Sequence, residues 1–85
     1  MGGRKLTTSH WAIRRWIEAR GGQPAVAART GGDGQYLRVD IPGFSGREFL
    51  MPITWQEFFA IFEDRQLAFV YEEEGASFQF VNRSG

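Results

Sequence analysis

The sequence has no cysteine, and it has only one lysine and one histidine among its 85 residues. Without cysteine it can form no disulfide, thiolate nucleophile or cysteine-based zinc site. Because small secreted domains usually depend on such cross-links, we expect a cytoplasmic protein.

Long apolar stretches are also missing from the chain. No run of apolar residues approaches the roughly 20 that a membrane-spanning helix requires. Residues 1–8 lack the apolar centre of a signal peptide. We therefore predict no membrane association, a flexible N-terminus over residues 1–8, and a single domain over residues 9–85.

Aromatic residues are plentiful, with eight phenylalanines, three tryptophans and two tyrosines. Each of these side chains buries about 150–250 Å², which gives a small domain enough apolar surface to fold. Charge is balanced overall but uneven along the chain, with +5 on residues 1–38 and −5 on residues 39–85. This asymmetry fits either attraction between the two halves or an external acidic partner.

Two helices are predicted. In the first, over residues 9–20, apolar Ile13, Trp16 and Ile17 share one face, with Ser9 as the N-cap. Gly21 and Gly22 then supply the left-handed stop. In the second, over residues 54–65, Thr54 and Glu57 form a capping box ahead of apolar Phe58, Ile61 and Phe62.

Alternating apolar and polar residues predict four strands, over residues 25–29, 36–41, 67–72 and 77–82, and a brief extended piece over 49–51. The fold class is therefore α+β with the order α-β-β-α-β-β. We expect an antiparallel sheet with both helices packed on one face. The expected core comprises Ile13, Trp16, Ile17, Leu37, Val39, Ile41, Phe58, Ile61, Phe62, Leu67, Phe69 and Phe78 or Phe80.

The two helices also suggest an internal repeat. The cap, apolar face and terminal cation of the first helix recur 45 residues later in the second. The chain is therefore either a duplication of an αββ unit or a pair of helices that share a common pattern.

The residues typical of catalysis are few. His10 is the sole histidine, the acidic pairs and triplets over residues 63–64 and 72–74 are typical of solvated surface, and the glycines of residues 31–34 lack the lysine of a phosphate-binding loop. We expect a protein with no catalytic residues, no metal site and no cofactor.

Two groups of residues are candidates for binding. Arg14 and Arg15 lie about one helical turn from Trp11, and arginines beside an aromatic ring are typical of single-stranded nucleic-acid binding. The nucleic-acid candidates are Arg4, Lys5, Trp11, Arg14 and Arg15. An aromatic residue in a constrained loop can instead anchor a protein partner. The candidates for that role are Phe44, Arg47 and Trp55.

Residues 13–16, 18–25, 37–40, 42–46, 53–59 and 67–71 resemble a family of small stand-alone bacterial proteins of uncharacterised function. Some members are labelled alpha-glucan branching enzyme, a label that we do not extend to this chain, because its length is far short of the roughly 200 residues of a (β/α)₈ barrel. The resemblance implies a domain type without an active site. The family pattern also leads us to expect acidic residues where this chain has Trp11 and Ala12.

We therefore predict a small interaction module that binds a protein partner, which is either a different protein or a second copy of itself. The alternative is nucleic-acid binding through the arginine-rich first helix. An enzyme would instead require a deep pocket of convergent polar groups near His10 or Tyr71.

Overall fold

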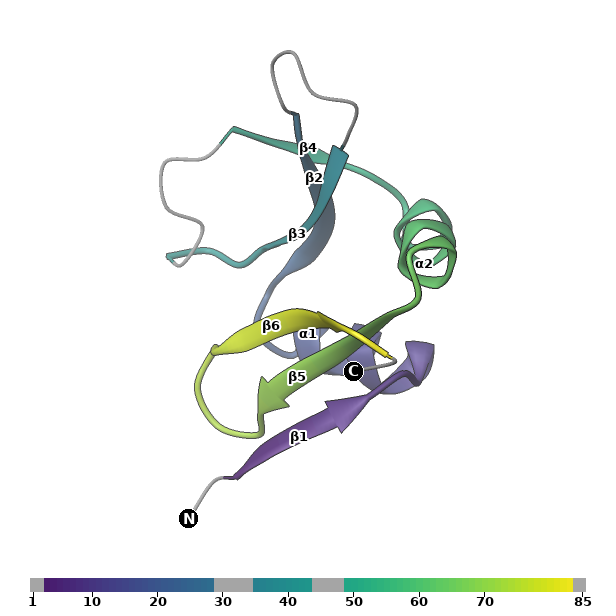
Figure 1. Ribbon diagram of the computed structural model, residues 1–85. Coiled ribbons are helices and arrows are strands. Elements are labelled where there is room, and N and C mark those ends of the chain that lie inside the picture. The colour runs from purple at the N-terminus through teal and green to yellow at the C-terminus, as the bar shows by residue number, and fades with distance from the viewer. Residues whose placement is uncertain (1–2, 29–34, 44–48, 84–85) are drawn as a thin grey trace.

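The computed structural model describes residues 3–28, 35–43 and 49–83. The glycine-rich residues 31–34 therefore lie outside the described residues. Within these residues, eight elements follow one another along the chain (Figure 1). They are β1 (Arg4–Thr7), α1 (His10–Glu18), β2 (Gln23–Ala28), β3 (Gln35–Asp40), β4 (Leu50–Pro52), α2 (Trp55–Asp64), β5 (Leu67–Glu72) and β6 (Phe78–Asn82). Neither helix has the length and apolar character needed to cross a membrane, in the part of the chain that the structure describes.

The strands form two antiparallel sheets of three strands each, ordered β1-β5-β6 and β3-β2-β4. Each sheet consists of one hairpin and one short strand from the other half of the chain. Thr7 in β1 pairs with Phe69 in β5, and Met51 in β4 pairs with Val26 in β2. The two halves thus repeat the order strand, helix, strand, strand and exchange their first strands (Figure 1).

The predicted α+β class and the order of the two helices and four hairpin strands are confirmed. The strands, however, divide into two sheets instead of forming one, because each hairpin is completed by the short strand that precedes the opposite helix. Residues 4–7, which lie in the segment predicted to be a flexible N-terminus, form β1 along β5. Leu6 is 64% exposed in this strand. The strand therefore lacks the alternation of buried apolar and exposed polar residues from which strands are predicted.

Helix α1 is fixed to the sheet β1-β5-β6 by Trp16. Its ring is only 6% exposed and makes edge contacts with the rings of Phe69, Tyr71 and Phe78. Its indole nitrogen donates a 2.7 Å hydrogen bond to the backbone oxygen of Glu72. Such a ring contributes a large apolar surface and a satisfied polar group at once. Ile13 and Ile17 are fully buried beside it.

Helix α2 begins at the predicted capping box. The side chain of Thr54 accepts a hydrogen bond from the backbone nitrogen of Glu57, whose carboxylate accepts one from the backbone nitrogen of Thr54. Phe58 and Phe62 are fully buried, and the helix contacts β2, β3 and β5. Both sheets therefore share a single core. Its buried members are Ile13, Trp16, Ile17, Val26, Leu37, Val39, Ile41, Phe58, Phe62 and Phe69.

Two glycines end α1. Gly21 has a φ of 71°, in the left-handed region that a helix stop requires. Gly22 is needed for space, since a Cβ there would lie 2.9 Å from Cγ2 of Ile17 and 3.0 Å from Cγ1 of Ile41. Both of these isoleucines are buried, so neither can move aside easily.

Gly22→Ala should therefore destabilise the protein by about 1–3 kcal/mol, because the added methyl group overpacks the core. Urea unfolding followed by circular dichroism measures the change. Gly3→Ala is the matched control, since its Cβ meets nothing within 4 Å, and it should stay within about 0.5 kcal/mol of the parent. Equal midpoints for the two variants would show that the core at Gly22 is not tightly packed.

Candidate functional site

An open groove of about 630 Å³ lies between α1 and α2. His10 contacts Glu63 near the end of α2, whereas Arg14 contacts Trp55 at its start, so the two helices run antiparallel along the groove. Its lining is mainly aromatic, with one arginine and one glutamate. The lining residues are His10, Trp11, Arg14, Trp55, Gln56, Phe59, Ala60 and Glu63.

The lining follows from the helical period of both walls. On α2, the core stripe of Phe58 and Phe62 is bordered by a second stripe that contains Trp55 and Phe59, four residues apart. On α1, Trp16 turns one face toward the sheet, which leaves Trp11 on the solvent side with 69% of its surface exposed. The groove is therefore formed where the outward faces of two core helices meet.

Three rings in the groove are stacked on one another. The imidazole of His10 lies parallel to the ring of Phe59, with centroids 4.1 Å apart and an interplanar angle of 7°. Phe59 in turn stacks on Trp55 at 5.6 Å and 21°. Because Phe59 also makes edge contacts with the buried rings of Phe58 and Phe62, the stack is anchored to the core.

Two arginines of α1 lie over tryptophan rings of the groove. The guanidinium of Arg14 is 5.5 Å from the Trp55 ring, and that of Arg15 is 5.0 Å from the Trp11 ring. Arg14 also pairs with Glu18 at 3.1 Å, one turn along the helix. No carboxylate of the described residues lies within ion-pair distance of Arg15. Arg15 therefore keeps its charge available beside Trp11, in a hollow that adjoins the groove.

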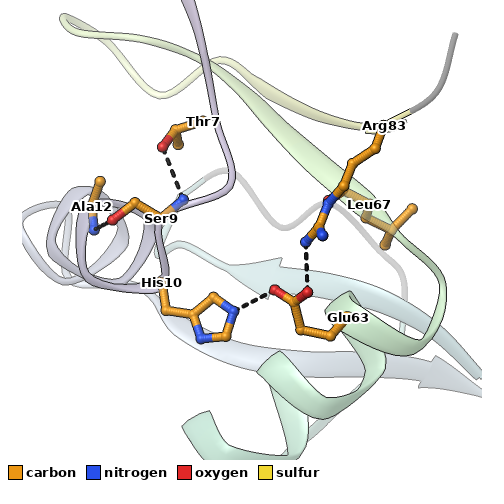
Figure 2. Close-up of polar contacts among 7 residues, drawn as sticks. All are labelled: Thr7, Ser9, His10, Ala12, Glu63, Leu67 and Arg83. Carbon is orange, nitrogen blue, oxygen red and sulfur yellow. Dashed lines mark hydrogen bonds and ion pairs between the residues drawn. The ribbon is translucent and has the colours of Figure 1, made fainter.

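A polar chain closes one end of the groove (Figure 2). Glu63 lies between His10 and Arg83, with its two oxygens 2.5 Å from Nε2 of His10 and 2.8 Å from Nη2 of Arg83. Arg83 also donates from Nε to the backbone oxygen of Leu67. These contacts connect α1, α2 and the segment after β6, and they orient the His10 ring onto Phe59.

The same chain sets the acidity of Glu63. Hydrogen bonds from Arg83 first, and from His10 second, lower the pKa of its carboxyl group. The lowered pKa means that the folded state favours the ionised carboxylate. Its contribution to stability is complete above the ordinary glutamate pKa and is lost as the pH falls through the lowered value.

Two of the five nucleic-acid candidates line the groove, a third lies next to it, and the other two lie on β1. Trp11 and Arg14 line the groove, and Arg15 lies over Trp11. Arg4 and Lys5 lie on β1, where Arg4 donates to Gln79 and Lys5 is 3.6 Å from Glu73. Both cations of β1 thus contact side chains of the β5–β6 hairpin and not the groove.

Of the three candidates for a protein partner, Trp55 lines the groove, whereas Phe44 and Arg47 lie outside the described residues. The sequence reasoning missed Gln56, Phe59 and Ala60. The sequence of α2 does indicate such a surface, because the helix has more apolar residues than are needed for a single stripe facing the core.

The described residues contain no group of three or more histidine, aspartate and glutamate side chains that could hold a metal ion. A comparison with protein-family models, curated proteins and solved structures finds no significant match to this chain. The resemblance to a bacterial family stays a prediction, and the geometry of the groove is the basis for assigning a function.

Arg83→Gln should raise the pKa of Glu63 toward its ordinary value, because it removes the largest cause of the lowering. The variant should accordingly lose less stability than the parent as the pH falls through the acidic range. Carboxyl ¹³C chemical shifts followed by pH titration measure the pKa directly.

Arg65→Gln serves as the control, since it removes an exposed charge at the C-cap of α2 and leaves both contacts of Glu63 in place. An unchanged Glu63 titration in Arg83→Gln would contradict the assignment.

Proposed function

We propose that this protein is a small, non-catalytic module that binds a partner protein in the groove between α1 and α2. The observation that carries the proposal is the exposed Trp11 beside the half-buried Trp55 and Phe59, all lining one groove. Tryptophan, tyrosine and arginine supply most of the binding energy at protein interfaces, and an exposed apolar hollow of this kind is typical of such a surface.

The rigidity of the lining supports this function. Stacking on Phe59 holds Trp55 and His10 in place, and Phe59 is anchored in turn by Phe58 and Phe62. A partner that packs against rings already ordered loses less side-chain entropy on binding, so that more of the contact energy appears as affinity.

The polar groups of the groove are also suited to being covered. His10 and Glu63 bond each other, and Glu63 has Arg83 as a second partner. Groups with partners in place cost less to remove from water than unpaired ones. Histidine bonded to a carboxylate can also serve as a general base. Here we assign the pair to holding the two helices together, because Glu63 is shared with Arg83 and the His10 ring is stacked.

The alternative function is nucleic-acid binding, and Trp11 is the observation that favours it. Its ring is mostly exposed and carries Arg15 over it, as in sites that stack bases. Tight polyanion binding depends mainly on many phosphate contacts. The chain has zero net charge, and Arg14 and Lys5 pair with Glu18 and Glu73. A protein partner is therefore the better-supported choice.

Photocrosslinking tests the proposal. A benzoylphenylalanine replaces Gln56 in the groove, and in a matched variant it replaces the exposed Gln79 of β6. In lysate of the source cells, position 56 should capture a defined protein that position 79 does not. Trp11→Ala should weaken this interaction about 30-fold, the effect of losing an interface hot spot of about 2 kcal/mol.

The exposure of Trp11 means that Trp11→Ala should retain the parent unfolding midpoint, which calorimetry checks. The capture is repeated with nuclease and at two salt concentrations. A crosslinked species removed by nuclease and weakened steeply by salt would decide for the alternative function. Equal capture at positions 56 and 79 would exclude the groove as the binding surface.

A further inference from the structure

The nature of the groove walls restricts what can bind between them. Both walls are α-helices, whose interior backbone groups hydrogen-bond along their own axis. At Arg14 and Phe59, midway along each wall, the groove presents side chains and no free backbone donors or acceptors. An occupant therefore finds few partners for its own main chain.

This restriction favours a helix over an extended segment. Backbone groups of an extended segment that face the groove would be covered without partners, at a cost in free energy for each. A helix enters with its backbone bonds already made, and it lays an apolar stripe of side chains into such a groove. The rings of Trp11, Trp55 and Phe59 offer the apolar contact surface for that stripe.

The charges at the rim restrict the occupant further. The cationic side chains are on the α1 side, where Arg14 lines the groove and Arg15 lies next to it over Trp11. No carboxylate of the described residues is within ion-pair distance of Arg15. Glu18 is the ion-pair partner of Arg14. On the α2 side, Gln56 and Ala60 are uncharged, and Glu63 is occupied by His10 and Arg83. The rim is thus positive along one wall only.

We propose that the groove binds an amphipathic α-helix of a partner protein, with carboxylates along the one flank that faces Arg14 and Arg15. The inference rests on the proposed function and adds the shape and charge of the occupant to it. The apolar stripe contacts Trp11, Trp55 and Phe59, and the acidic flank meets the guanidinium groups of α1. A one-sided charge also fixes which way round the helix lies in the groove.

Three synthetic peptides of equal length test this proposal. The first is a stapled helix with a leucine stripe and glutamates along one flank. The second carries lysines in place of these glutamates. The third is the first sequence with two central residues replaced by proline, which prevents it from forming a helix. Each is titrated into ¹⁵N-labelled protein up to millimolar concentration, and the indole N–H signals of the three tryptophans are followed.

The tryptophans give both the readout and its internal control. Trp11 and Trp55 line the groove, whereas the indole of Trp16 is buried and bonded to the backbone of Glu72. The acidic helix should shift the signals of Trp11 and Trp55 and leave that of Trp16 in place. The lysine peptide should bind at least about fivefold more weakly, and the proline peptide should cause no shift.

Arg15→Gln should weaken the acidic helix about five- to tenfold, as expected for one lost charge-assisted contact. Arg65→Gln, at the C-cap of α2 and away from the lining, should leave its affinity unchanged. Equal binding of the proline peptide, equal binding of the lysine peptide, or no shift with any peptide would each overturn the proposal. If crosslinking from position 56 still captured a protein in that case, the groove would remain a binding surface with a different kind of occupant.

Discussion

The contact of Trp16 with the sheet β1-β5-β6 is the interaction on which the candidate site depends. Its ring meets Phe69, Tyr71 and Phe78, and its indole nitrogen is satisfied by the backbone of Glu72. Burial of so large a ring fixes α1 both in position and in rotation about its own axis. The opposite face of the helix is therefore held toward solvent, with Trp11 displayed on it.

The second wall of the groove arises from an excess of aromatic residues on α2. Phe58 and Phe62 join this helix to the core, and both are fully buried. Trp55 and Phe59 lie beside this buried pair and are only partly covered by the core. Residues that serve stability and residues available for recognition thus lie side by side on one helix, and the buried pair supports the half-exposed pair.

Local sequence patterns predicted what is local in this fold. Ser9 and Thr54 were predicted as caps from residue type and spacing, and both accept the expected backbone hydrogen bonds. The third strand of each sheet could not be predicted in this way, because β1 and β4 are short and owe their pairing to strands in the opposite half. The groove is not predictable from the sequence for the same reason: the local pattern places Trp11 and Trp55 in separate hypotheses, and only the approach of the two helices brings them to one surface.

The exchange of first strands has a consequence for the order in which the chain can acquire its structure. β1 is synthesised before its partner strand β5, which follows only after α2. The sheet β3-β2-β4 can close earlier, because all its strands precede α2. The nascent chain therefore carries β1 with an unsatisfied edge until its second half has emerged, and the two halves become native together.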